Sequence, residues 1–146
     1  ITYANSDYSE FSVTSWSGAE TTGNPWDQAA AATPAKVAPP YPNPPSVTTT
    51  VTDTLVVVFG MSWAGWDPLA TMPSGYTMRE QGSNGNNNDV AVGPKALAAA
   101  TTEDPGTFTS TLNPGNTADT AAVTIALKAV GASGPAGRIR HRVINQ

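Results

Sequence analysis

The residues with the clearest binding chemistry are two tryptophans and one acid in the segment of residues 61–67: Trp63, Trp66 and Asp67. Flat aromatic faces stack on sugar rings, and a nearby carboxylate accepts hydrogen bonds from sugar hydroxyls. These three residues are therefore candidates for glycan contact. The alternative is ordinary aromatic packing, in which Trp66 caps one end of the core. A further tryptophan, Trp26, is predicted to anchor a long connection to the sheet.

A second group of oxygen-bearing side chains lies in residues 84–89 and includes Asn86, Asn88 and Asp89. Amide and carboxylate oxygens are the ligands that Ca²⁺ prefers, which makes these residues weak calcium candidates. Only Asp89 carries a charge, and the spacing matches no standard calcium loop. Because Asn and Gly are the usual residues of turns, an exposed turn is the favoured interpretation. No metal ion and no other cofactor is predicted.

The remaining chemistry-bearing residues give no catalytic pattern. Glu103 and Asp104 are two adjacent acids, and paired carboxylates hydrolyse glycosidic bonds. Neighbouring residues in a turn point in different directions, however, and Pro105 and Gly106 follow, so a plain turn is favoured. The single histidine, His141, lies near the end, which excludes a Ser-His-Asp triad or a histidine metal site in the body. We therefore predict no enzymatic activity.

Residues 131–146 differ in composition from the chain before them. Residues 131–137 are Gly, Ala, Ser and Pro only, which predicts a flexible linker. Beyond them lies an alternating basic segment whose candidates for contact with a neighbouring subunit are Arg138, Ile139, Arg140, Arg142 and Val143. An extended backbone would place the arginines on one face, ready to add a strand to another subunit. A disordered end and a phosphate-binding or acid-binding arm remain the alternatives.

The composition excludes several classes of protein. Only 12% of the residues are charged, and there is no cysteine, so neither disulfides nor thiolate metal sites can stabilise the chain. The net charge of −4 combines a basic tail with an acidic body, because residues 1–130 carry four basic residues against all eleven acids, or −7. An acidic body repels nucleic acid. No apolar run is long enough for a membrane span, so membrane insertion is not expected.

Short β-branched runs separated by turn residues predict an all-β fold. The run from Leu55 to Phe59 is continuously apolar and is expected to be a central strand buried on both faces. A core is predicted from Leu55, Val57 and Phe59 together with Val123, Ile125 and Leu127. The other expected strands are 46–51, 76–80, 90–99 with an interruption at Gly93-Pro94, 107–112 and 120–129.

Residues 18–45 are predicted to form a long crossover without a helix or a central strand over most of its length, because prolines recur through it and proline cannot donate a ladder hydrogen bond. Within this segment, a helical turn is predicted only for residues 29–32. The whole chain then divides into a sandwich domain over 1–130 and a linker with a basic tail over 131–146.

Residues 1–17 have the same order of elements as residues 108–129: a strand, a turn of small residues, and a strand containing Val-Thr. We expect residues 1–17 to be the end of a first half-repeat and residues 46–130 to be a second one. A complete first half would then need roughly 60 residues ahead of Ile1.

Six segments resemble β-sandwich domains of bacteriophage virion proteins and of large bacterial extracellular proteins. They are residues 45–50, 53–60, 73–79, 90–95, 105–109 and 123–127. Such domains consist of two related halves, and Trp16 lies where the first half closes, although Ser17 stands where an arginine is usual. The resemblance implies an antiparallel, jelly-roll-like β-sandwich, N-terminally incomplete and with an extended C-terminal tail, but it names no catalytic residue.

The resulting expectation is a non-enzymatic structural protein of a virion surface: a decoration, spike or fibre subunit. Its partners would be copies of itself or other surface proteins, with host glycans as a further ligand. Its location would be the virion surface or the extracellular space. The alternatives are a carbohydrate-binding module of a secreted bacterial protein and a subunit of an extracellular filament or surface layer.

Overall fold

The computed structural model describes residues 13–32, 35–39, 41–63, 71–83, 89–110, 117–130 and 140–142. These residues form an all-β structure in which every strand pair is antiparallel. None of the described residues lies in a helix. The strands in chain order are β1 (Ser15–Ser17), β2 (Trp26–Ala31), β3 (Ala35–Val37), β4 (Val47–Thr48), β5 (Thr54–Ser62), β6 (Glu80–Ser83), β7 (Asp89–Leu97), β8 (Thr102–Glu103), β9 (Ala118–Lys128) and β10 (Arg140–Arg142).

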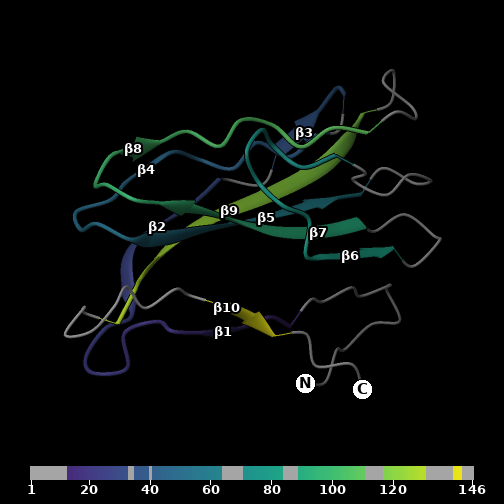
Figure 1. Cartoon of the computed structure of the whole chain (residues 1–146). Helices are drawn as coiled ribbons and strands as arrows, with labels where there is room; N and C mark the ends of the chain where they lie inside the picture. The colour runs from purple at the N-terminus through teal and green to yellow at the C-terminus, as the bar shows by residue number, and fades with distance from the viewer. Residues whose placement is uncertain are drawn as a thin grey trace.

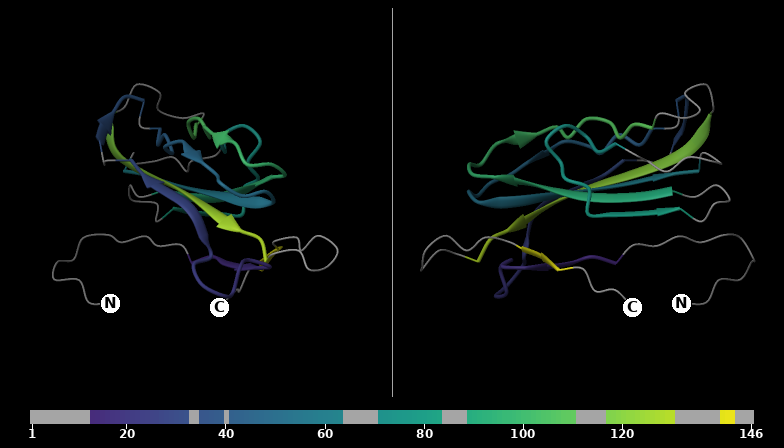
Figure 2. Two further views of the ribbon diagram at one scale, coloured as in Figure 1. Left: turned by 90° about the vertical axis from the view of Figure 1, so that its left-hand side faces the viewer. Right: turned by 45° about the vertical axis from the view of Figure 1, so that its right-hand side comes forward.

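The central layer is a sheet in the order β2-β9-β5-β7-β6, with β3 also paired to β9 (Figure 1). On one side of it lies a layer that contains the β4–β8 pair and long extended segments. On the other side lies the β1–β10 pair, as the rotated views also show (Figure 2). The described residues therefore form an antiparallel β-sandwich, which confirms the predicted fold class.

β5 occupies the centre of the sheet because its sequence is apolar at every position from Leu55 to Phe59. A strand that is covered on both faces reads as a continuous apolar run and not as an alternation. Its neighbours β9 and β7 pair with it along its whole length. The predicted strands at 55–59 and 120–129 are confirmed: β5 is longer at both ends, and β9 begins two residues earlier and ends one residue earlier than predicted.

β7 runs without interruption through Gly93 and Pro94, where a break was expected. The Pro94 carbonyl points away from β5 and accepts a hydrogen bond from the Thr77 N–H (3.1 Å). In a strand the N–H and carbonyl of one residue point to the same side, so the N–H that Pro94 lacks would also point away from β5. A proline fits a sheet where no ladder donor is required of it. β6 begins only at Glu80, so the predicted strand over 76–80 is wrong for most of its length.

Residues 18–45 contain two strands that the proline pattern did not predict, although neither is central in the sheet. β2 and β3 both lie in this range and both pair with β9. Pro25 precedes β2, and a second proline separates β2 from β3, so the stretch between the prolines keeps all its N–H donors. Long-range pairing with β9 decided the structure here, and residues 29–31 are strand where a helical turn was expected.

The two faces of the central sheet are covered to different extents. The closed face points toward the β4–β8 layer, and its members include Val56, Val58, Ala91, Thr124 and Ala126. Phe108, which has no exposed surface, packs onto this face above Gly60. The closed face therefore carries one of the two hydrophobic core clusters, and Leu55, Val57, Val90 and Val92 form the other on the opposite face.

The opposite face, called the open face below, carries Leu55, Val57, Phe59, Met61, Val123, Ile125 and Leu127. Leu55 and Val57 are buried as predicted, but Phe59, Val123, Ile125 and Leu127 keep part of their surface exposed. The predicted core therefore lies on the less covered face. The larger side chains stand where the covering layer is thinner.

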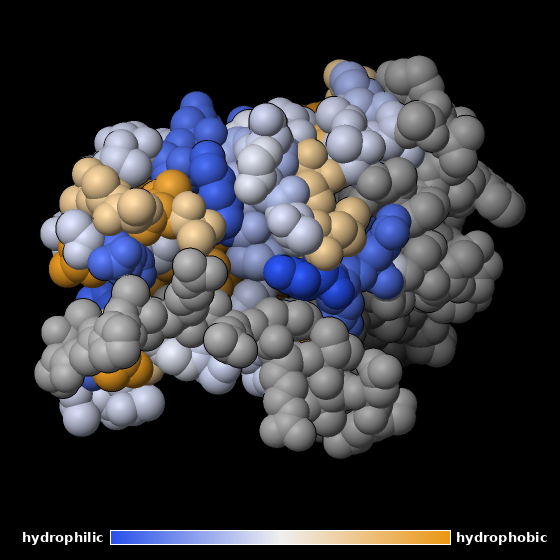
Figure 3. All heavy atoms as spheres, in the orientation of Figure 1, coloured by the Kyte–Doolittle hydropathy of each residue, from blue (hydrophilic) through white to orange (hydrophobic). Residues whose placement is uncertain are grey.

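The remaining predicted strands are shorter than expected. The strand over 46–51 is reduced to β4, and Thr109 makes a single bridge to Thr71. On the surface, apolar residues reach solvent in small patches near the end that carries β4 and β8, with hydrophilic residues between them (Figure 3). Scattered apolar groups of this kind are normal on protein surfaces. No helix within the described residues is long and apolar enough to cross a membrane.

Candidate functional site

A groove of about 190 Å³ lies on the open face, between the sheet and the segment that carries β1. Its walls are almost entirely apolar, and three of the lining residues are aromatic. The lining residues are Thr14, Trp16, Trp26, Val57, Phe59, Ile125 and Leu127. Four of them come from β5 and β9, and the two tryptophans come from β1 and β2.

Trp16 packs against the core cluster of the open face, and its strand β1 pairs with β10, where Trp16 stands opposite His141. Beyond β1, the chain is tied to the end of β9 by a bridge between Ala19 and Ala129 and by a bond from the Val130 N–H to the Gly18 carbonyl (2.9 Å). The Trp16 indole N–H donates to the hydroxyl of Thr14 (3.2 Å). These contacts fix one wall of the groove.

Trp26 begins β2 and stands opposite Leu127 of β9, which places it on the open face. The backbone N–H of Trp26 donates to the side-chain carbonyl of Asn24 (3.0 Å). This bond closes a local turn from which the strand starts. A register shift follows directly, and Asp27 turns the other way to accept hydrogen bonds from the N–H and hydroxyl of Thr50. The Trp26 side chain is 50% exposed.

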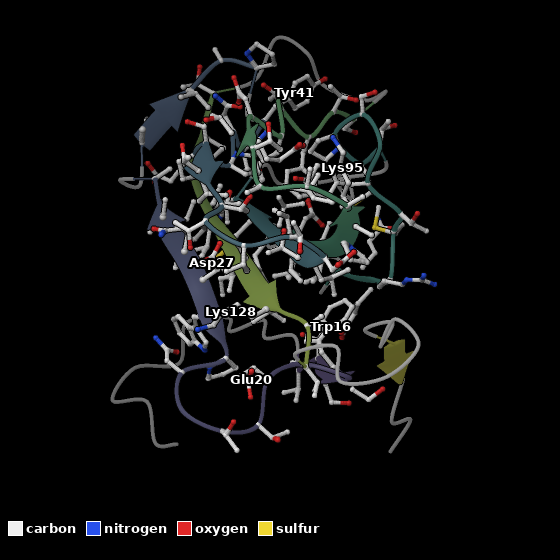
Figure 4. All side chains as sticks on the ribbon, turned by 60° about the vertical axis from the view of Figure 1, so that its left-hand side comes forward. Trp16, Glu20, Asp27, Tyr41, Lys95 and Lys128 are labelled. Atoms are coloured by element: carbon white, nitrogen blue, oxygen red, sulfur yellow. The ribbon has the colours of Figure 1, made fainter. Side chains whose placement is uncertain are left out.

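Two opposite charges lie beside this end of the sheet, Glu20 and Lys128 (Figure 4). The Glu20 N–H donates to the Lys128 carbonyl (2.9 Å), so the two residues are neighbours across the chain. The Glu20 carboxylate accepts bonds from the Thr22 hydroxyl (2.6 Å) and the Thr22 N–H (3.1 Å). These bonds lower the pKa of Glu20.

The described residues that line the groove form a surface suited to apolar groups. Among the described lining residues, Thr14 carries a hydroxyl, and this hydroxyl accepts the Trp16 indole N–H. A concave apolar surface with aromatic walls recognises a ligand by desolvation and ring stacking. Sequence reasoning missed this groove because Trp16, Trp26 and Ile125 come from three segments that only the sheet brings together.

The structure places only one of the glycan-contact candidates. Trp63 follows β5, and its N–H donates to the Asp119 carbonyl (2.9 Å). Its side chain is 55% exposed, on the same side of the sheet as the nearby Met61, which is 43% exposed. Trp66 and Asp67 lie outside the described residues. An exposed indole suits a stacking surface, but the predicted three-residue platform stays a prediction.

The candidate calcium ligand Asp89 does not lie in an exposed turn. It opens β7, opposite Ser62, and is almost fully buried, because the strand begins one residue earlier than the turn pattern indicated. Asn86 and Asn88 lie outside the described residues. Within the described ranges, no group of three or more acidic or histidine side chains is arranged to hold a metal ion.

The tail candidates Arg140 and Arg142 lie in β10, where they stand opposite Ser17 and Ser15 of the same chain. The expectation of an extended strand is confirmed for these residues. Their pairing in this structure is internal, and pairing with a neighbouring subunit stays a prediction. Arg138, Ile139 and Val143 lie outside the described residues.

Glu103, considered above as part of a turn, forms a buried polar cluster in the layer over the closed face. It lies in β8 and accepts bonds from Lys95 Nζ (2.7 Å) and the Tyr76 hydroxyl (3.2 Å). Lys95 also lies over the Tyr76 ring, 5.7 Å from its centroid. Burial, followed by the charge of Glu103, raises the pKa of Tyr76. These contacts connect β7, β8 and Tyr76, and they are called the clamp below.

Comparison with known protein families, with curated proteins and with solved structures finds no match to this chain. The groove and the exposed indoles are thus the observations on which a function can be built.

Proposed function

We propose that this chain is a non-enzymatic structural subunit of a virion surface or of a comparable extracellular assembly. Its role is to bind neighbouring subunits, either copies of itself or other surface proteins. The observation that carries this proposal is the open face of the sheet, where Trp26, Met61 and Trp63 are each about half exposed. Trp26 stands opposite Leu127 at one end of this face and Met61 stands opposite Ala121 at the other, so exposed apolar groups are available to partners at both ends.

The other side of the molecule supports the same role, because it provides a rigid base. Pro42 and Pro44 are fully buried, and the Thr124 hydroxyl donates to the Pro45 carbonyl (2.6 Å). The Tyr41 hydroxyl donates to the Ser110 carbonyl (2.7 Å), 69 residues away in the chain. Segments tied to a sheet by such long-range bonds hold a binding face in a fixed shape, which lowers the entropic cost of assembly.

The direct test is location in the native source. An antibody raised against the purified chain is used to probe purified virions, the extracellular fraction and the cytosol. We expect the chain in the particle or the extracellular fraction, at a fixed ratio to the other surface proteins. A chain found only in the cytosol would overturn the proposal.

Carbohydrate binding is the second candidate, and the exposed Trp63 is the observation that favours it. A glycan array tests it, with Trp63→Ala as the variant and Trp26→Ala as a matched control of similar exposure. Loss of glycan binding in Trp63→Ala alone, at an unchanged melting temperature, would support a sugar platform. An array without any bound glycan would remove this candidate.

A further inference from the structure

The groove is an apolar hollow, and an apolar side chain projects into solvent beside it. The hollow of about 190 Å³ has a floor of apolar side chains from β5 and β9, namely Val57, Phe59, Ile125 and Leu127. The projection is Trp26, which lines the groove but leaves half of its indole in solvent. An apolar cavity of about 150 Å³ is large enough to hold benzene, so this groove has room for one aromatic ring.

We propose that the occupant is the Trp26 side chain of a second copy of this chain, exchanged reciprocally across a two-fold axis. A two-fold interface uses the same patch on both partners, so that patch must be self-complementary. A patch with one aromatic projection beside one aromatic hollow meets this condition. The inference rests on the proposed function and adds the partner and the contact residues to it.

The charges beside the groove agree with a two-fold arrangement. Glu20 and Lys128 lie next to one another at the end of the sheet, one of each sign. A two-fold rotation can place the Glu20 of each copy toward the Lys128 of the other, which favours this register over those that oppose like charges. The acidic bodies repel each other only weakly at physiological salt, because charges beyond about 8 Å are screened.

Small side chains next to Trp26 allow a close approach. Ala29 and Ala31 of β2 stand opposite Ile125 and Val123, on the open face, and both are exposed. Val13, beside the groove residue Thr14, is 86% exposed. These exposed apolar residues add to the surface that a second copy can cover.

The edge of β2 itself is a poorer route for assembly. Its first residues carry a register shift, and the Asp27 carboxylate binds Thr50 of the neighbouring segment at that edge. Bulges and charged groups at strand edges are the features that prevent edge-to-edge pairing. Association through the open face is therefore favoured over addition of strands to β2.

The test is the oligomeric state of the full chain, measured by sedimentation velocity from micromolar to near-millimolar concentration. We expect a species of twice the monomer mass of 15.0 kDa. Trp26→Ala should raise the dimer dissociation constant at least about 30-fold, the loss expected when a hot-spot tryptophan is truncated. Trp63→Ala, which removes an equally exposed indole at the other end of β5, should leave it within about threefold.

A cross-linking experiment tests the geometry independently. The chain has no cysteine, so one introduced thiol is the only one present. Val13→Cys at the margin of the groove should give a dimer with a short bis-maleimide, and Ser46→Cys in the opposite layer should not. Circular dichroism and the melting temperature of each variant show whether it remains folded.

The outcomes separate this inference from the proposed function. A wild-type chain that stays monomeric over the whole range overturns the inference, as does an equal effect of Trp26→Ala and Trp63→Ala. If that monomeric chain is still found in the particle, the proposed function stands and another protein covers the groove. Dimerisation that is lost only in Trp26→Ala supports the inference wherever the chain is located.

Discussion

The closed and open faces of the central sheet come from the same strands, and they differ in which side chains are covered. On β9 the closed face receives Ala122, Thr124 and Ala126, which are almost fully buried. The open face receives Val123, Ile125 and Leu127, which are larger and yet partly exposed. On β9 the small residues allow the covering layer to come close, so the burial of this strand's side chains follows the approach of that layer and not their size.

The difference between the faces has a functional consequence. A face that is packed to interior density has no surface left for a partner. The open face keeps several large apolar side chains in partial contact with water, and covering them releases free energy at about 25 cal/mol per Å². Stability is therefore expected to depend mainly on the closed face, and association mainly on the open one.

The largest expected effect is the loss of Phe108 from the closed face. Phe108→Ala should lower the free energy of unfolding by about 3–5 kcal/mol, because the ring is fully buried. Phe59→Ala, the matched change on the open face, should cost only about 1–2 kcal/mol, because Phe59 is partly exposed. Urea unfolding of both variants measures the difference. Equal losses would show that the two faces are equally covered.

The next effect comes from the close contact between β5 and the covering layer. A Cβ atom added at Gly60 would lie 2.6 Å from Cε2 of Phe108, closer than real atoms approach. Gly60→Ala should therefore cost about 1–3 kcal/mol through overpacking. In a Phe108→Leu background the cost of Gly60→Ala should fall, and a double-mutant cycle would detect this coupling. An unchanged cost would mean that the strain lies elsewhere.

A smaller effect is expected from alkaline pH, which acts on the clamp over the closed face. The folded protein holds the pKa of Tyr76 above its ordinary value of about 10. As the pH rises, the unfolded chain releases the phenolic proton first. The stabilisation is therefore complete below about pH 10 and decreases as the pH rises toward the higher pKa of the folded state.

The measurement for this prediction is the urea midpoint at about pH 8 and about pH 11, in the wild type and in Tyr76→Phe. The variant lacks the titrating phenol but keeps the ring, so its loss of stability with pH should be shallower. Parallel curves would assign the alkaline loss to other groups.

The smallest effect is expected from the tail, on the open side. Within the described residues, β10 is the strand partner of β1, which carries Trp16. Deletion of residues 131–146 should cost about 1 kcal/mol, the value of one or two exposed hydrogen bonds, and shift Trp16 fluorescence to longer wavelength. A chain ending at Arg142 keeps β10 and is the control. An identical response of both chains would exclude a role for β10 in holding Trp16.

The sequence by itself determined the all-β class and the position of the central strands. The apolar run at 55–59 and the alternation over 120–129 are local patterns with a period that only strands have. The alternation on β9 also showed that two different faces exist. The predicted core consisted of the larger residues, because a sequence pattern gives the size of each side chain. It does not give the distance from the strand to the layer that covers it.

Only the tertiary structure decided which face is closed, where β2 and β3 pair, and which tryptophans meet. Pairing of residues 26–31 with β9 is a contact across almost 100 residues, and no local pattern records it. The groove likewise depends on Trp16, Trp26 and Phe59, which come from three separate strands of two layers. Local propensity fixes the backbone of a strand, whereas register and layer packing decide which of its side chains remain available for binding.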